Sequence, residues 1–390
     1  MQDILDADIV RLTNTILNDA INNGASDLHL EPYEKFYRVR LRINGTLTQH
    51  SQLPFYLANR LTTRIKVLAQ LDISERRLPQ DGHFRIRIQQ HHYVDLRVSS
   101  CPTIHGEKIV LRILDPTTLQ FAIDQLGFEP FQKEMYLRHI NKQQGMILVT
   151  GPTGSGKTVS LYSALKILNV TQVNISTIED PVEINLPGIN QVNINSKSGL
   201  EFATVLRCML RQDPDIIMIG EIRDLETAQI AIKAAQTGHL VLSTLHTNTA
   251  VDVLSRLISM GIPAYNLASS LSLIISQRLC RILCKNCKIK VLLPPAKLLE
   301  LGFSAEELQQ QDLTIFTNNG CEQCHDGYNG RTGIYEMLEI TPEIRQIILA
   351  DGNFLDIAKY SAAQGNWTLS QAAFNKVRAG IISYYEAVNI

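Results

Sequence analysis

Eight consecutive residues have the types and the spacing of a loop that wraps around phosphate groups. They are Gly151, Pro152, Thr153, Gly154, Ser155, Gly156, Lys157 and Thr158. The glycines allow backbone amides to turn inward onto phosphate oxygens, the lysine can reach the β- and γ-phosphates, and the threonine hydroxyl can hold Mg²⁺. A glycine-rich turn with an incidental lysine is the alternative interpretation. The setting favours the phosphate loop, because an apolar strand at 146–150 runs into it and a helix through Leu168 follows.

A site that cleaves phosphate also needs a carboxylate at the tip of a neighbouring strand, to orient the metal and the attacking water. Glu221 follows the apolar run 216–219 and Gly220, and Glu179 follows a strand that ends at Ile178. We expect Glu221 to be the catalytic or metal-orienting group and Glu179 to be a second polar group beside the nucleotide. Which of the two activates water stays open, and either one alone could be a helix cap or a turn residue.

Four of the seven cysteines form two pairs with the same spacing: Cys284 with Cys287, and Cys321 with Cys324. Four thiolates complete a tetrahedral Zn²⁺ site and leave no open position, so the pattern predicts structural zinc. The segment between the pairs is longer than in a usual zinc ribbon and is interpreted as an insertion over about 280–330, with a helix at 295–301. A redox CxxC motif is the alternative, but the second pair argues against it. The other three cysteines are interpreted as buried thiols: Cys101, Cys208 and Cys280.

The elements around these residues fall into two patterns. From Gly145 onward, short apolar strands alternate with helices, which is typical of a buried, mostly parallel sheet. Strands are expected there at 146–150, 173–178, 216–219 and 240–245. The preceding third is predicted to be a small α+β module with helices at 8–21 and 54–71 and alternating strands at 37–43, 84–88 and 94–98. Three arginines share one face of its first such strand, interpreted as a solvated face: Arg38, Arg40 and Arg42.

Composition excludes several classes of protein. The chain is 45% apolar and 19% charged, so it can build real cores. Its 37 Lys and Arg against 38 Asp and Glu give a net charge of −1, which argues against a protein that coats DNA. No apolar run is long enough to span a membrane, and the acidic N-terminus lacks the features of a secretory signal. We therefore expect a cytoplasmic protein.

Several motifs in one order resemble those of the bacterial type II secretion and type IV pilus assembly ATPases. They are the phosphate loop, the acidic box at 178–183, the Walker B region at 210–224 and the histidine box at 237–248, preceded by matching segments at 26–32, 71–82 and 101–108. The resemblance covers almost the whole chain. It implies an α/β fold: a RecA-like P-loop ATPase core at 131–390 carrying the zinc insertion, a PAS-like α+β domain at 1–115, and a linker at 116–130.

The resemblance also implies a function. Members of the family are homohexameric, Mg²⁺-dependent ATP hydrolases that power assembly of a type IV pilus or a type II secretion pseudopilus. They work peripherally at the inner membrane, on a platform protein, and no nucleic acid partner is expected. The four cysteines favour assembly over retraction, and the chain resembles shorter members without the N-terminal docking domain. The alternatives are a pilus retraction ATPase, a RecA-like DNA translocase and a nucleotide-binding scaffold without turnover.

The family pattern points to arginines that would place positive charge at the γ-phosphate, from the same subunit or a neighbour. They are Arg64, Arg76 and Arg77 in the first module and Arg207, Arg211 and Arg223 in the core. Ordinary surface ion pairs are the alternative. By the same resemblance, His239 and His246, which flank the strand at 240–245, are expected to contact the γ-phosphate or to pass strain to the subunit interface. Histidines hydrogen-bonded to backbone are the alternative.

Overall fold

The computed structural model describes the chain except for residues 1, 90–91, 116–121, 301, 310–313 and 351–352. The chain divides into two compact units, Met1–Leu119 and Gln120–Ile390. Part of the predicted linker at 116–130 lies outside the described residues. Leu126, from the same segment, is buried with Tyr136 and Tyr335 in a core of the second unit.

The first unit is a six-stranded antiparallel sheet with two helices. Its strand order is β3-β2-β1-β6-β5-β4. The strands are β1 (Asp27–Pro32), β2 (Phe36–Ile43), β3 (Thr46–Pro54), β4 (Gln80–Gln89), β5 (His92–Thr103) and β6 (Gly106–Leu114), and the helices are α1 (Gln2–Asn22) and α2 (Ala58–Leu68). This agrees with the predicted α+β module, although the helix predicted at 54–71 is shorter and follows a 3₁₀ turn at Phe55–Leu57.

Alternation along the strands builds the core of the first unit. In β2, Tyr37, Val39 and Leu41 are buried, and they belong to one cluster with Leu17 of α1 and Ile65 of α2. Both helices therefore cover the same face of the sheet.

The arginines of β2 share the other face, as predicted, but that face is not simply solvated. Arg38 and Arg40 are each only 26% exposed, and both bond to the buried carboxylate of Glu31 at 3.0 and 2.8 Å. Burial alone would raise the pKa of Glu31, but the hydrogen bonds from these arginines and from Lys108 lower this pKa to about 2. A carboxylate on the adjacent strand β1 therefore organises this face, and the pattern of β2 alone could not reveal it.

The second unit is built on a seven-stranded sheet in the order β15-β12-β7-β11-β10-β8-β9. All neighbouring strands are parallel except β15, which runs antiparallel to β12 at the edge. The strands are β7 (Gly145–Thr150), β8 (Ile175–Glu179), β9 (Asn190–Asn193), β10 (Ile216–Ile219), β11 (Leu240–Leu245), β12 (Leu271–Leu283) and β15 (Tyr328–Glu339). The predicted strands at 216–219 and 240–245 agree with β10 and β11 in both bounds.

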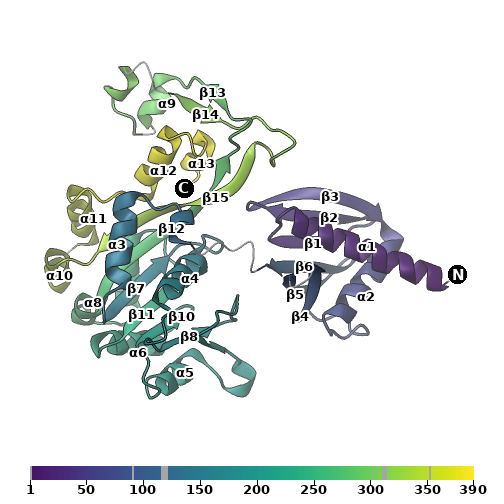
Figure 1. The fold of residues 1–390 in the computed structure, drawn as a ribbon, viewed down its shortest axis with the longest axis horizontal. Helices are drawn as coiled ribbons and strands as arrows, with labels where there is room; N and C mark the ends of the chain where they lie inside the picture. Colours follow the sequence, from purple (N-terminus) through teal and green to yellow (C-terminus); the bar gives the residue numbers. More distant parts are fainter. Residues whose placement is uncertain (1, 90–91, 116–121, 301, 310–313, 351–352) are drawn as a thin grey trace. The chain divides into compact units, whose positions relative to one another are not determined.

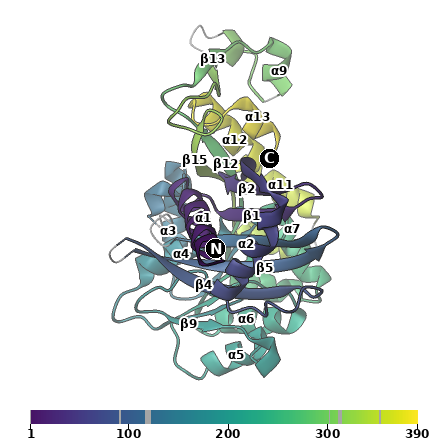
Figure 2. The ribbon, with the colours of Figure 1, turned by 90° about the vertical axis from the view of Figure 1, so that its right-hand side faces the viewer.

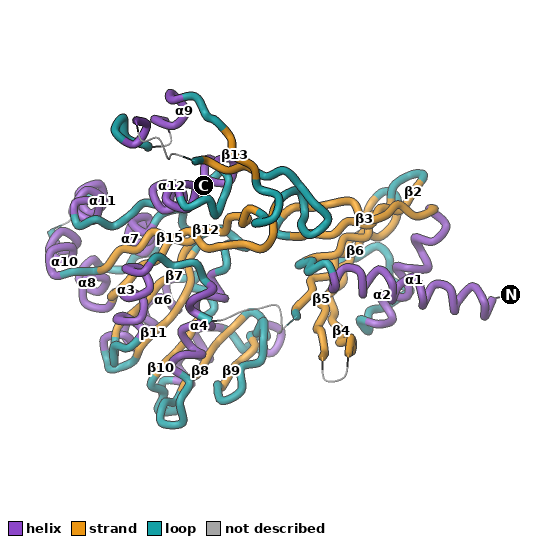
Figure 3. Tube along the Cα trace, turned by 45° about the horizontal axis from the view of Figure 1, so that its top comes forward, coloured by secondary structure: helices purple, strands orange, loops and turns teal. Residues whose placement is uncertain are grey.

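Helices flank this sheet in two layers (Figure 3). Alternate residues of β7 enter different cores: Ile147 packs with Tyr136 of α3 and Leu165 of α4, whereas Leu148 packs in the other core. The helices are α3 (Pro130–Ile140), α4 (Lys157–Leu168), α5 (Phe202–Met209), α6 (Leu225–Gln236), α7 (Ala250–Ser259), α8 (Ala264–Ser270), α10 (Pro342–Leu349) and α11 (Phe354–Ala363). Burial on both faces explains the continuous apolar runs of these strands.

The cysteine-bearing insertion lies beside the C-terminal helices in Figures 1 and 2. It holds β13 (Ile289–Val291), α9 (Pro295–Glu300) and β14 (Ile315–Thr317), and the chain ends with α12 (Leu369–Arg378) and α13 (Tyr384–Val388). Leu298 and Ile315 of the insertion share a core with Ala373 and Val377 of α12. The residue that would end the predicted helix at 295–301 lies outside the described residues. Within those residues, the structure has no helix of sufficient length and apolarity to traverse a lipid bilayer.

Candidate functional site

The predicted phosphate loop connects a buried strand to a helix. Strand β7 ends at Thr150 and helix α4 begins at Lys157. Gly151 has a φ of 142°, and a Cβ on it would lie 2.4 Å from the carbonyl oxygen of Gln277. Gly156 has a φ of 87°, and a Cβ on it would lie 2.8 Å from Nε2 of the same glutamine. Only glycine combines this backbone with such close packing. The loop is therefore held against β12 in a curved path.

Gln277 and its neighbour in β12 support the loop from behind. Its Nε2 donates to Ser155 O at 2.7 Å, and its Oε1 accepts from the Ser160 hydroxyl at 2.7 Å. Arg278 donates to Gln277 O at 3.1 Å and to Asn248 O at 3.1 Å. Neither residue is among those that the sequence motifs predict for the site. Their signal was a Gln-Arg pair in the middle of a mostly buried strand, because large polar side chains are tolerated there only when they are hydrogen-bonded.

The donors of the loop fit a phosphate group. Lys157 Nζ donates to Gly151 O at 2.7 Å and Pro152 O at 3.1 Å, so it lies over the loop. Burial lowers its pKa to about 8, with nearby Glu221 acting to raise it and Arg278 to lower it. The buried Ser155 hydroxyl has no hydrogen-bond partner among the described residues. A cationic amine, an unused hydroxyl and a helix N-terminus together favour an anion.

Glu221 lies at the same edge of the sheet as the loop. Strands β7, β11 and β10 are adjacent and parallel, so their carboxyl ends meet there. Arg223 donates to Glu221 Oε1, and His246 Nε2 lies 3.4 Å from Glu221 Oε2. Burial would raise the pKa of Glu221, but the hydrogen bond from Arg223 and the nearby His246 hold it below its usual value. Glu221 is thus an ionised carboxylate beside the Arg223 guanidinium and the His246 imidazole.

Glu179 is placed differently. It ends β8, is only 3% exposed and accepts hydrogen bonds from the Tyr162 hydroxyl, Thr177 Oγ1 at 2.6 Å and Gln191 Nε2 at 3.1 Å. Tyr162 lies on α4, the helix that starts at the phosphate loop. The carboxylate therefore ties α4 to β8 and β9, next to the Walker B strand β10.

The structure does not bring His239 to the phosphate loop of its own chain. His239 precedes β11, whose six residues span about 20 Å, whereas the loop follows the parallel neighbour β7. Its Nδ1 lies 3.0 Å from Ala234 O, the backbone bond of the alternative interpretation. Within one subunit, strand polarity therefore puts His239 at the sheet edge opposite to the loop, and its role at the γ-phosphate or at the subunit interface stays a prediction. His246, at the other end of the strand, does reach the site.

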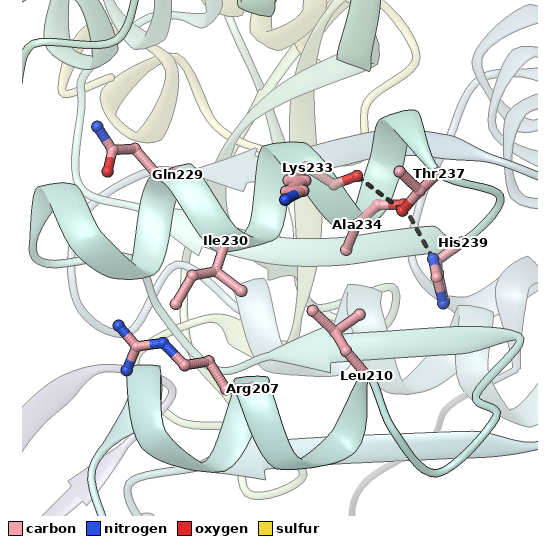
Figure 4. A pocket seen from close by; sticks show the side chains of 8 residues that line it. All are labelled: Arg207, Leu210, Gln229, Ile230, Lys233, Ala234, Thr237 and His239. Carbon is pink, nitrogen blue, oxygen red and sulfur yellow. Dashed lines mark hydrogen bonds between the residues drawn. The ribbon is translucent and has the colours of Figure 1, made fainter.

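Two of the core arginines make their contacts with residues other than Glu221. Figure 4 shows Arg207 of α5 and His239 at a pocket of about 400 Å³ between α5 and α6; it is lined by Arg207, Leu210, Gln229, Ile230, Lys233, Ala234, Thr237 and His239. Arg207 pairs with Glu226, and Arg211 Nη1 donates to Arg207 O at 2.8 Å. Of the three predicted core arginines, only Arg223 therefore lies beside Glu221.

The predicted arginines of the first unit lie on or after α2. Arg64 is on the helix, and its buried Nε has no hydrogen-bond partner among the described residues. Arg76 and Arg77 are exposed on the loop between α2 and β4. Their roles at a nucleotide stay predictions.

The four predicted cysteine ligands converge. Their sulfur atoms lie within 4.8 Å of one another, with Cys284–Cys321 at 3.9 Å, Cys287–Cys324 at 3.7 Å and Cys321–Cys324 at 3.5 Å. Tetrahedral zinc with bonds of about 2.3 Å places its sulfurs ~3.8 Å apart, whereas a disulfide needs about 2.05 Å. The cluster therefore fits Zn²⁺. Among the remaining thiols, Cys280 is buried as expected, but Cys101 and Cys208 are exposed, so that interpretation was wrong for both.

A parallel sheet with a phosphate loop, an opposing carboxylate and flanking helices defines a P-loop nucleotide-binding fold. The family model described as Type II/IV secretion system protein matches residues 3–389. The chain belongs to this family.

Similar proteins agree with that assignment. The chain is 56% identical over 381 residues to the type IV pilus assembly ATPase PilB of Acinetobacter baylyi, covering 98% of this chain and 66% of that protein. It is 42% identical over 393 residues to the type II secretion system protein E of Pectobacterium carotovorum, covering 100% of this chain and 77% of that protein. The chain thus spans about two thirds of the length of the PilB relative.

Solved structures share the fold. The pilus retraction motor PilT with bound ADP superposes with a TM-score of 0.64 at 27% identity, over 96% of this chain and 95% of that one. The ATPase DotB of Legionella pneumophila superposes with a TM-score of 0.70 at 22% identity, over 97% and 94%. At that identity, DotB supports the fold alone.

Proposed function

We propose that the chain is the Mg²⁺-dependent ATPase of a hexameric motor that powers assembly of a type IV pilus or a type II secretion pseudopilus. The observation that carries the proposal is the placement of Lys157 and the ionised Glu221 at one sheet edge. The names of the PilB and protein E relatives support assembly. The motor would act in the cytoplasm, peripherally at the inner membrane, on a platform protein.

The residues of the loop would hold ATP. The backbone amides of 154–158 would bind the β-phosphate, Lys157 would bind the β- and γ-phosphates, and the Thr158 hydroxyl would bind Mg²⁺. When bound, Mg²⁺ supplies charge neutralisation at the phosphate oxygens. Glu221 would orient the attacking water, with Glu179 as a second carboxylate near the site. Arg223 would add positive charge beside Glu221, and His246 would lie close enough to contact the γ-phosphate. The arginines of the first unit would reach the γ-phosphate in the same or a neighbouring subunit.

A retraction motor is the second candidate, favoured by the superposition on PilT. The four-cysteine cluster favours assembly instead, as the family resemblance implied. Measuring ATP turnover of the purified protein, with its metal content, tests the proposal. Turnover with bound zinc is expected. An active protein without zinc would favour a retraction motor. ATP turnover that is stimulated by DNA would favour a translocase. Assembled rings that do not hydrolyse ATP would favour a scaffold.

We expect ATP affinity to fall as pH rises from 7 to 9. Lys157 binds phosphate as an ammonium ion, and burial has lowered its pKa to about 8, so the free loop loses this charge in that range. The apparent affinity should drop about tenfold by pH 9, because the proton must then be taken up on binding. Titration of a fluorescent ATP analogue at each pH measures it. Lys157→Arg stays charged and should show a flat profile; an equally steep profile would contradict the assignment.

We expect one zinc ion per chain, lost in the double variant Cys284→Ser/Cys321→Ser. Hydroxyls do not replace thiolates as zinc ligands, and the metal joins the ends of β12 and β15. Its loss should lower the melting temperature by about 5 °C or more. Elemental analysis and calorimetry measure the two effects. The exposed Cys208→Ser is the matched control and should retain both zinc and stability. Wild-type protein purified with no metal would contradict the prediction.

A further inference from the structure

The loop that carries Arg76 and Arg77, residues 72–80, is fixed by hydrogen bonds inside the first unit. Gln80 joins its two ends: its Oε1 accepts from Asp72 N at 2.8 Å, and its Nε2 donates to Asp72 O and Glu75 O, both at 3.0 Å. Asp72 caps the first turn by accepting from Ser74 N at 2.8 Å. Glu75 accepts from Arg77 N at 2.6 Å and pairs with the Arg77 guanidinium at 3.1 Å. The loop therefore has one defined path.

A buried lysine ties this loop to the sheet. Lys66, in the last turn of α2, is 1% exposed. Its Nζ donates to Glu75 O at 2.6 Å and to Oε1 of Glu107 on β6 at 2.8 Å. The Glu107 side chain is only 5% exposed, so both charges are removed from water. The ammonium thus bridges the middle of the arginine loop and the central part of the sheet.

Such a pair is a poor way to stabilise a core. Removing two charges from water costs about as much as their attraction returns, and apolar replacements of the same volume are often neutral or stabilising. The pair does fix the position of the loop. A buried ammonium group must have hydrogen-bond acceptors, and here the backbone of the loop supplies one of them. The contact fixes the loop at Glu75, the residue that immediately precedes Arg76 and Arg77.

We propose that Lys66, paired with Glu107, is a positioning residue that holds the 72–80 loop so that Arg76 and Arg77 are presented for γ-phosphate cleavage. The inference rests on the proposed ATPase function and extends it to residues that touch no substrate. Lys66 acts on the reaction only through the loop. Gln80 is a second, half-buried anchor of the same loop and should act in the same sense.

The test measures the loop and the reaction separately. Trypsin cuts after Arg76 and Arg77, so the rate of cleavage at these bonds, followed by mass spectrometry on the native protein, reports opening of the loop. Steady-state ATP turnover reports the reaction. Lys66→Met should speed this cleavage about tenfold and lower kcat about tenfold or more, with KM within about twofold, because the arginines act on transition-state charge. Arg85→Met, which breaks the exposed Arg85–Asp95 pair of the same sheet, should change neither.

A double variant separates positioning from stability. Lys66→Met/Glu107→Leu removes the whole buried pair, so no unpaired carboxylate is left and the melting temperature should return towards that of the wild type. If the pair positions the loop, trypsin should still cut the double variant fast at Arg76 and Arg77, and the variant should still hydrolyse ATP slowly. Recovery of wild-type turnover in the double variant would overturn the inference. Should Lys66→Met not fold, Gln80→Ala decides: faster cleavage with lower kcat supports the inference, and no change in either overturns it.

Failure of the proposed function gives a different result, because the wild-type protein itself would then show no ATP turnover, whatever the tryptic cleavage rates are. Arg76→Ala and Arg77→Ala should each lower kcat. If both retain wild-type turnover, the role of the arginines in the reaction falls, and the positioning role of Lys66 falls with it, whatever the cleavage rates are. If the arginine variants are slow while Lys66→Met/Glu107→Leu and Gln80→Ala are both normal, the ATPase proposal stands and only the inference about Lys66 fails.

Discussion

Lys157→Ala is expected to abolish detectable ATP hydrolysis and to weaken ATP binding about a hundredfold or more. The amine is the cation that crosses the phosphate loop, and charge-assisted hydrogen bonds to two phosphates are worth about 1.5–3 kcal/mol each. The remaining backbone amides cannot replace a mobile positive charge at the γ-phosphate. Phosphate release under saturating ATP and equilibrium binding of a labelled nucleotide measure the two effects.

The matched control for this variant is Lys166→Ala. Lys166 lies in the last turn of the same helix, α4, and is exposed, so its removal tests the loss of a lysine from the element without touching the loop. It should hydrolyse ATP at the wild-type rate. Wild-type binding and turnover in Lys157→Ala would show that the nucleotide is bound elsewhere.

Glu221→Gln is expected to lower kcat by about 10²–10³ while ATP binding is retained or tightened. Glutamine preserves the shape of the side chain but removes the negative charge that would orient water, and loss of a positioned base or orienting group typically costs this much. The variant also relieves repulsion between the carboxylate and the γ-phosphate. Single-turnover hydrolysis and nucleotide binding separate the two effects. Glu226→Gln, which alters the exposed partner of Arg207, is the control and should turn over normally.

Comparing Glu221→Gln with Glu179→Gln would assign the two carboxylates. Glu179 already accepts three hydrogen bonds in a buried position, so an amide there should mainly loosen the contact between α4 and β8 and lower the melting temperature. Hydrolysis indistinguishable from the wild type in Glu221→Gln would remove Glu221 from its assigned role. If Glu179→Gln alone were folded and inactive, the two roles would be exchanged.

The local parts of the fold were predictable because their signals are local. Strand β10 is an uninterrupted apolar run and β11 a mostly apolar one, and the loop from Gly151 to Thr158 is a contiguous motif between a strand and a helix. Thr341 caps α10 through its hydrogen bond with Ile344 N, as its threonine-proline-glutamate sequence indicates. The cysteine cluster was equally accessible, since ligand type and spacing suffice to define it.

What could not be predicted depends on which strands become neighbours. Gln277 supports the loop from more than a hundred positions later in the chain, because β12 pairs with β7. Likewise, the Glu31 carboxylate that gathers the arginines of β2 comes from a different strand. The position of His239 is another matter: once β7 and β11 are taken as parallel, a residue before β11 must lie at the edge opposite to the loop. The edge on which His239 lies therefore follows from the polarity of the two strands alone.

Strand β12 connects two distant parts of the second unit. It carries Gln277 against the phosphate loop and ends at Leu283, directly before the cluster cysteine Cys284, about 20 Å further on. Hydrogen bonding to β15 accompanies it over most of that distance. The four-cysteine cluster and the back of the phosphate loop are therefore joined by one hydrogen-bonded strand, so a change at the cluster can reach the loop through the backbone of β12.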